Sequence, residues 1–103
     1  MHIVIFITAP NKKEAGHIAK KLIQKKLAAC VNIIANIDSI FWWKAKVDSA
    51  KEVLLVVKST KSKLAKIIKL VKATHSYDTP EIIALPIIGG EKKYLKWIDD
   101  SVR

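Results

Sequence analysis

The sequence predicts one α+β domain, residues 1–103, with helices on one face of a four-stranded sheet. Two observations lead to this fold class. The apolar residues change between the spacing of strands and the spacing of helices in the order strand, helix, strand, strand, helix, strand, followed by a short helix. The second and third strands of the chain also follow each other across a tight turn, which predicts a hairpin.

The first two elements are a buried strand and an amphipathic helix. Residues 2–8 form a continuous apolar run rich in Ile and Val, which is typical of a buried strand. Asn11, with Glu14 three residues later, resembles the capping box that begins a helix. The apolar side of this helix is then predicted at Ala15, Ile18, Ala19, Leu22 and Ile23.

The hairpin is the most informative element. One strand is predicted over 29–43 and the next over 46–58, with the turn at Lys44-Ala45. A regular strand over 29–43 places one set of residues on a single face: Val31, Ile33, Ala35, Ile37 and Phe41. Such a strand is about 45–50 Å long, whereas a compact domain of this size is about 35 Å across. We therefore expect the hairpin to project, with an apolar tip that needs a partner.

The second half repeats the pattern of the first. A helix is predicted from near Thr60, with an apolar side at Leu64, Ile67, Ile68 and Val71. A strand over 81–88 follows, and Pro86 places it at a sheet edge or a bulge. Gly89-Gly90 ends that strand, and the last short helix has its apolar side at Tyr94, Leu95, Trp97 and Ile98. Two β-α-β units with right-handed crossovers in one sheet give the ferredoxin-like fold βαββαβ.

Composition narrows the function classes. The chain has a net charge of +10, but its lysines cluster over 12–26 and 58–72 with the spacing of two solvated helix faces. Its one arginine is Arg103, so the residue best suited to phosphate and guanine recognition is nearly absent, and nucleic acid is not an expected partner.

No apolar run reaches the ~20 residues of a membrane helix. The single cysteine, Cys30, excludes an internal disulfide, and a cytoplasmic location is expected.

Six segments, taken together and in order, resemble the CutA, or CutA1, divalent-cation tolerance family over essentially the whole chain. The matching segments are Thr8-Ala9-Pro10, Lys26 to Ile33 (KLAACVNI), Trp43, Glu52-Val53 with Lys58, His75 to Ile82 (HSYDTPEI), and Tyr94 to Trp97 (YLKW). The resemblance implies a homotrimer built like the PII signalling proteins, with an extended hairpin, and a link to tolerance of copper and other divalent cations. It implies no catalytic activity, and no catalytic motif is found in the sequence.

The resemblance also implies a cleft between subunits, where a small ligand binds. Its candidate residues here are Trp43, Glu52, Lys58, Tyr77 and Glu81. The alternative is that these charged residues form a structural ion pair that seals the interface. Both interpretations depend on a second copy of the chain.

His75 is the candidate metal ligand, since imidazole suits copper and other divalent transition metals. Asp78, Glu81 or a neighbouring subunit would have to complete the coordination, so weak rather than tight binding is expected. The alternative is a histidine at a helix end, packed under the following loop. Copper-linked relatives have a cysteine and a second histidine where this chain has Ile7 and Thr74.

Two other departures from the family concern Ser76, where proline is usual, and Ala45, where glycine is usual. A two-residue hairpin turn favours positive φ, so Ala45 implies either a different turn or backbone strain.

Two other functions stay open: a PII-like sensor of small molecules with no direct metal role, and an RNA-binding module. The third strand reads Val53-Leu54-Leu55-Val56-Val57, without the aromatic residues on which RNA-recognition domains stack bases, so RNA binding is the less favoured.

Overall fold

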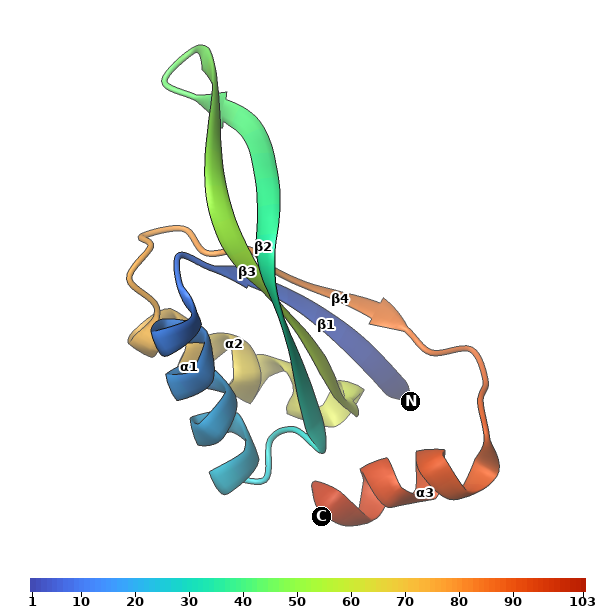
Figure 1. Cartoon of the computed structure of the whole chain (residues 1–103). Coiled ribbons are helices and arrows are strands. Elements are labelled where there is room, and N and C mark those ends of the chain that lie inside the picture. Colours follow the sequence, from blue (N-terminus) through green and yellow to red (C-terminus); the bar gives the residue numbers. More distant parts are fainter.

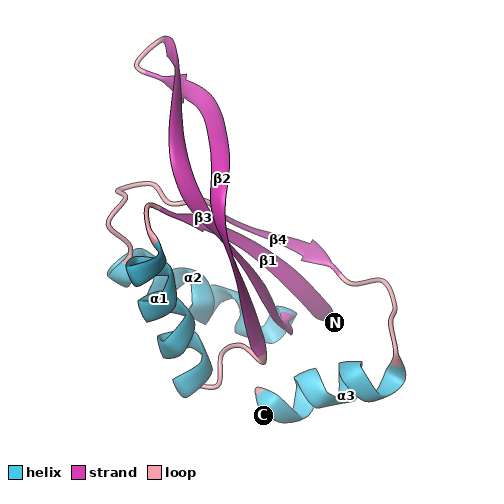
Figure 2. Ribbon diagram, in the orientation of Figure 1, coloured by secondary structure: helices cyan, strands magenta, loops and turns pink.

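The computed structural model describes residues 1–103 and confirms the ferredoxin-like order of elements. The elements are β1 (His2–Ala9), α1 (Lys12–Gln24), β2 (Cys30–Trp43), β3 (Lys46–Thr60), a 3-10 turn (Lys61–Lys63), α2 (Leu64–Thr74), β4 (Ile82–Pro86) and α3 (Lys92–Ser101). The strands form one antiparallel sheet in the order β2-β3-β1-β4. In Figure 1, α1 and α2 lie on the same face of the sheet, and α3 lies near the end at which β1 begins. Figure 2 shows the opposite face of the sheet without a helix across its middle.

One hydrophobic core lies between the sheet and the helices α1 and α2. Alternate residues of the two central strands point into it and are at most 5% exposed: Ile3, Ile5, Ile7, Val53, Leu55 and Val57. The helices contribute Ala15, Ile18, Ala19, Leu22, Ile67 and Val71, all buried. The predicted helix faces are thus confirmed in their centres, whereas Ile23, at the margin of its stripe, is 42% exposed.

The start of α1 confirms only half of the expected capping box. The Asn11 side chain accepts the hydrogen bond of the Glu14 N–H at 2.8 Å and caps the helix. The Glu14 carboxylate does not return to Asn11. It accepts hydrogen bonds from Ser76 instead, and this contact ties α1 to the loop after α2.

The hairpin projects from the core, as expected. The molecule measures 45 × 25 × 22 Å, and the far part of β2 and β3 extends beyond the helices in Figure 1. The tip is solvated in one chain, since Trp42 is 75% exposed and Trp43 is 58% exposed. The turn has positive φ at Lys44 (51°) and Ala45 (63°), as a two-residue hairpin turn of type I′ requires. The two-residue turn therefore forms with alanine in place of glycine, and Ala45 takes a strained backbone conformation.

A β-bulge interrupts β2. Its pairing with β3 shifts between Ile34 and Ile37, so Ala35 and Asn36 together lie opposite Val53. Asn36 takes a left-handed φ of 61°, a conformation that asparagine tolerates better than most residues.

The bulge corrects the predicted face of β2. Val31 and Ile33 pair with β3 residues that point to the helices, whereas Ile37 and Phe41 pair with β3 residues that point to the opposite side. The prediction of one continuous face was wrong because a single extra residue reverses the alternation of every side chain beyond it.

The last strand is shorter than predicted, because β4 ends at Pro86 instead of residue 88. It is an edge strand, as Pro86 indicated, and pairs only with β1. No helix of the chain combines the length and the apolar composition needed to cross a membrane.

Candidate functional site

The base of the hairpin holds a buried carboxylate. Glu52 lies on β3, directly before the apolar run 53–57, and is only 8% exposed. Its Oε2 accepts a hydrogen bond of 2.8 Å from the hydroxyl of Tyr77, which lies in the loop after α2. Burial, followed by this hydrogen bond and the charge of Glu52, raises the pKa of Tyr77 to about 12. Tyr77 therefore stays a neutral phenol at ordinary pH.

His75 anchors the loop that carries Tyr77. Its side chain is fully buried, its Nδ1 accepts a hydrogen bond from the Tyr77 N–H at 3.0 Å, and its Nε2 lies 2.7 Å from the Thr8 carbonyl oxygen. Because Nδ1 accepts the Tyr77 N–H, Nε2 is the ring nitrogen that donates to the Thr8 carbonyl oxygen. Both ring nitrogens are therefore in use, and the ring joins β1 to the loop.

Glu14 completes this anchor from α1. Its Oε2 accepts hydrogen bonds from the Ser76 N–H and the Ser76 hydroxyl, each at 3.0 Å, and lies 3.3 Å from Nδ1 of His75. A proline at position 76 would have neither donor. Ser76, which departs from the family pattern, thus makes two hydrogen bonds that a proline at this position would not make.

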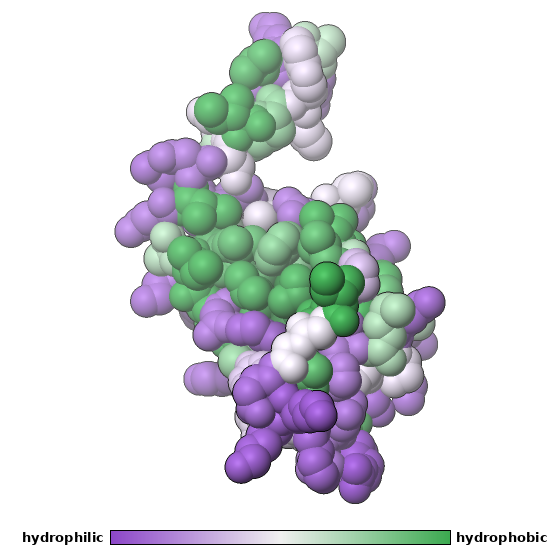
Figure 3. Space-filling model, turned by 90° about the vertical axis from the view of Figure 1, so that its right-hand side faces the viewer, coloured by the Kyte–Doolittle hydropathy of each residue, from purple (hydrophilic) through white to green (hydrophobic).

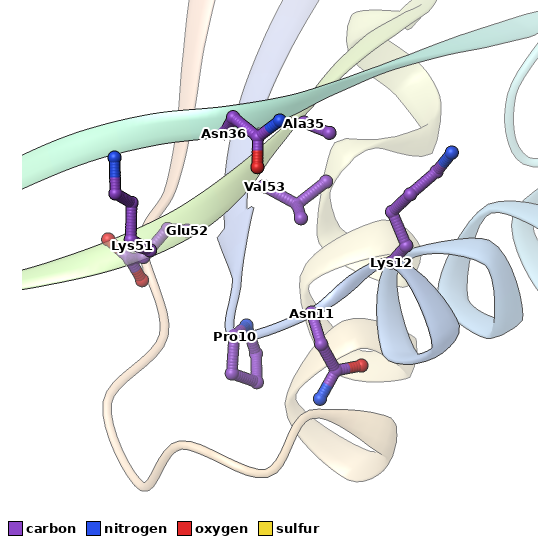
Figure 4. A pocket seen from close by; sticks show the side chains of 8 residues that line it. All are labelled: Pro10, Asn11, Lys12, Ala35, Asn36, Lys51, Glu52 and Val53. Carbon is purple, nitrogen blue, oxygen red and sulfur yellow. The ribbon is translucent and has the colours of Figure 1, made fainter.

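A pocket of about 340 Å³ opens beside Glu52, where the hairpin leaves the core. Figure 4 shows its lining arranged between the hairpin and the turn that precedes α1: Pro10, Asn11, Lys12, Ala35, Asn36, Lys51, Glu52 and Val53. The bulge at Ala35–Asn36 forms one wall. Sequence reasoning missed this wall, because Asn36 also fits a regular strand, although asparagine is enriched among residues with positive φ.

The other predicted cleft residues lie elsewhere in one chain. Lys58 is on the same strand as Glu52, but about 20 Å away for six residues of extended strand, and its ammonium contacts the Asn32 side chain. Trp43 is at the hairpin tip, with the Lys44 ammonium 5.8 Å from its ring. Glu81 is exposed at the end of its loop. One chain brings together Glu52 and Tyr77, and it does not bring the other three to them.

The residues around His75 do not fit a metal ion within one chain. No group of three or more His, Cys, Asp or Glu side chains is placed to hold one. Asp78 and Glu81 are exposed and are not gathered at the ring. Ile7 is apolar and buried, and the Thr74 hydroxyl donates to the Leu70 carbonyl oxygen at 2.9 Å. This geometry favours the role of a packed histidine at the end of a helix.

The open face of the sheet is apolar and lies beside the candidate site. Figure 3 shows a band of apolar residues across this face and further apolar residues at the hairpin tip above it. By strand alternation the face consists of Val4, Phe6, Ile34, Leu54, Val56, Ile83 and Leu85. Ile34 is 47% exposed and Ile83 is 52% exposed, so one chain leaves a large part of this surface in water.

Comparison with known proteins identifies a family. The model of the CutA1 divalent ion tolerance protein family matches residues 3–101. The divalent-cation tolerance protein CutA of Archaeoglobus fulgidus is 52% identical over 102 residues, which are 99% of each chain. The chloroplastic protein CutA 1 of rice is 48% identical over 101 residues, which are 98% of this chain but 57% of that protein. This chain thus spans little more than half the length of the plant relative.

Solved structures agree with this similarity. A structure of the periplasmic divalent cation tolerance protein CutA from Archaeoglobus fulgidus superposes with a TM-score of 0.97 at 51% identity, covering 100% of both chains. A divalent cation tolerance protein from Thermus thermophilus gives a TM-score of 0.98 at 43% identity, also over 100% of both chains. The chain therefore belongs to the CutA1 divalent ion tolerance family.

Proposed function

We propose that the chain works as a homotrimer in the tolerance of, or response to, divalent cations such as copper, and that it is not an enzyme. A cleft between copies, near Glu52 and Tyr77, would hold the metal ion or a small ligand. Membership of the CutA1 family supports the link to divalent cations. The observation that carries the assembly is the apolar open face, which a single chain does not cover.

Light scattering after size-exclusion chromatography tests the assembly. Three chains of 11.5 kDa should give a mass of about 35 kDa at micromolar protein concentration. A folded species of 11.5 kDa would contradict the proposal.

The proposed response to metal involves weak binding, and the ligands would come from more than one copy. Within one chain a copper ion at His75 would have to displace the bond to Thr8 or the bond to Tyr77. We therefore expect micromolar affinity, equivalent to roughly 8 kcal/mol, with His75 outside the ligand set. Calorimetry with Cu²⁺ on the native protein and on His75→Gln tests this. Equal affinities support a packing role, whereas lost binding at unchanged mass would make His75 a ligand.

A PII-like sensor of small molecules is the second candidate function. It is favoured by the pocket of about 340 Å³, which falls within the range of small-molecule sites. Its lining combines two lysines, two asparagines and one carboxylate, which suits a polar ligand with an anionic group. Protection of the native protein against heat by a small anion such as citrate, lost in Lys12→Ala, would favour this candidate over the metal response.

A cytoplasmic location is part of the proposal. Its support is the single thiol of Cys30, which excludes an internal disulfide. The names of two relatives place those proteins in the periplasm and the chloroplast. Fractionation of the native cells, followed by detection of the protein, tests the location directly.

A further inference from the structure

Two side chains on the open face carry charges that the chain itself does not pair. Glu52 and Lys58 lie on the same side of β3, with Leu54 and Val56 between them. Neither takes part in any ion pair of the chain. Glu52 receives one hydrogen bond, from the neutral hydroxyl of Tyr77, and Lys58 donates to the side-chain oxygen of Asn32.

This arrangement is unusual for the carboxylate. Glu52 as a residue is only 8% exposed, and a glutamate buried to this degree normally has a cation or several hydrogen-bond donors as partners, because desolvation disfavours an isolated charge. Tyr77 supplies only one hydrogen-bond donor, and a phenol carries no positive charge in any protonation state found in proteins. The carboxylate therefore still lacks a cation.

No lysine of the same chain forms an ion pair with Glu52. Lys51 is the next residue, but by strand alternation it points to the opposite side, where its ammonium pairs with Asp38 at 2.8 Å. Lys58 faces the correct side, but lies about 20 Å away along the strand. Lys12 of α1 lines the same pocket as Glu52 but forms no ion pair with it, and the other lysines of α1 and α2 are on helices that cover the other face of the sheet.

The open face is complementary to a second copy of itself. It has a carboxylate at one end, an ammonium at the other and apolar residues between them. In a ring of three copies, one part of this face contacts a different part of the face on the next copy, so the Glu52 end can meet the Lys58 end. We propose that Glu52 of one copy forms an ion pair with Lys58 of the next copy, while Tyr77 holds the carboxylate in position. The inference rests on the proposed assembly and specifies its register.

Charge reversal tests the pair. In Glu52→Lys and in Lys58→Glu, each contact between copies would join like charges, and we expect the dissociation constant of the assembly to rise at least about 100-fold. The double variant Glu52→Lys with Lys58→Glu restores opposite charges and should return to within about tenfold of the native value. Analytical ultracentrifugation gives the constants, and circular dichroism checks that each variant is folded.

Lys51→Glu is the matched control, since it makes the same charge change as Lys58→Glu on the other side of the same strand. It should change the dissociation constant by no more than about threefold. Single reversals that weaken assembly with no recovery in the double variant would overturn the ion pair, as would single reversals without effect. A native protein that is a monomer would instead overturn the proposed assembly. Only recovery of the dissociation constant in the double variant supports the ion pair.

Discussion

The two faces of the sheet are built from the same strands and are both largely apolar in their centres, yet helices cover only one of them. On the helix side, Ile5 and Leu55 are fully buried in a single chain. On the open side, their neighbours Phe6 and Leu54 are only partly buried, and Ile83 is 52% exposed. Strand alternation alone would predict polar residues on a face meant for water. The residue types therefore indicate that both faces are meant to be buried, and α1 and α2 cover only one.

The hairpin extends this contrast beyond the core. Past the bulge, Phe41 and Trp43 continue on the open side by strand alternation, although nothing in one chain covers them. Removal of apolar surface from water is favourable by roughly 25 cal/mol per Å². Neighbouring copies that cover the open face and the tip would gain this free energy at every contact between copies. The following predictions test whether the two sides differ in this way.

The largest effect is expected for Trp43→Ala. If a neighbouring copy covers this indole, its removal leaves a cavity between copies and should cost about 3–5 kcal/mol per chain. Light scattering should then detect dissociation, and calorimetry a lower melting temperature. Trp42→Ala, on the other side of the hairpin, is the control. An unchanged mass and melting curve for Trp43→Ala would place Trp43 on the solvent side.

The neighbours Leu55 and Leu54 compare the two faces directly. Leu55→Ala should lower the free energy of unfolding by about 2–5 kcal/mol, because the side chain lies in the core of one chain. Its mass should stay that of the native assembly. Leu54→Asp should do the reverse: the helices and strands persist by circular dichroism, but the mass falls. Retention of the native mass by Leu54→Asp would show that the open face is not an interface.

The element order was predictable from the sequence because each element carries a clear period. The alternation in β3 and the helical stripe of α1 are both consequences of one buried side, and both were found. The bulge was not predictable in this way. Ala35 and Asn36 fit a regular strand as well as a bulge, and the choice depends on how β2 pairs with β3 over its whole length.

The candidate site was predictable only as a set of residue types. Sequence reasoning placed Glu52 and Lys58 on one side of β3, and the pairing confirms it. It could not predict that Glu52 is buried under Tyr77, since this contact joins residues 25 positions apart through a loop without regular structure. The role of Glu14 was equally hidden, because a capping box and a contact with Ser76 use the same carboxylate.

A pH titration tests the bond between Tyr77 and Glu52. The pKa of Tyr77 is raised to about 12 from an ordinary value of 10.0, so its contribution to stability is complete below pH 10 and is lost as the pH rises to about 12. Tyr77→Phe removes the hydroxyl, leaves a buried carboxylate with no donor, and should cost about 1–3 kcal/mol at neutral pH. The free energies of unfolding of the native protein and of Tyr77→Phe, measured from pH 8 upward, should therefore converge as the pH rises. A loss of stability at alkaline pH that is as large in Tyr77→Phe as in the native protein would contradict the assignment.

The smallest effect is expected at the turn, which belongs to neither face. Ala45 has a φ of 63°, and a residue with a Cβ loses about 1–2 kcal/mol in this left-handed region. Ala45→Gly relieves that strain but gives the unfolded chain more freedom, at a cost of about 0.4–1 kcal/mol. The net result should be a gain of about 0.5–1 kcal/mol in the free energy of unfolding, with no change in mass. Ala50→Gly is the matched control, because the same substitution in the extended part of β3 should lose about 0.5–1 kcal/mol. Opposite signs for the two variants would confirm that the turn is strained by its alanine. If Ala45→Gly instead destabilised the protein as much as Ala50→Gly, another contact of the tip, such as a neighbouring copy, would have to stabilise the alanine.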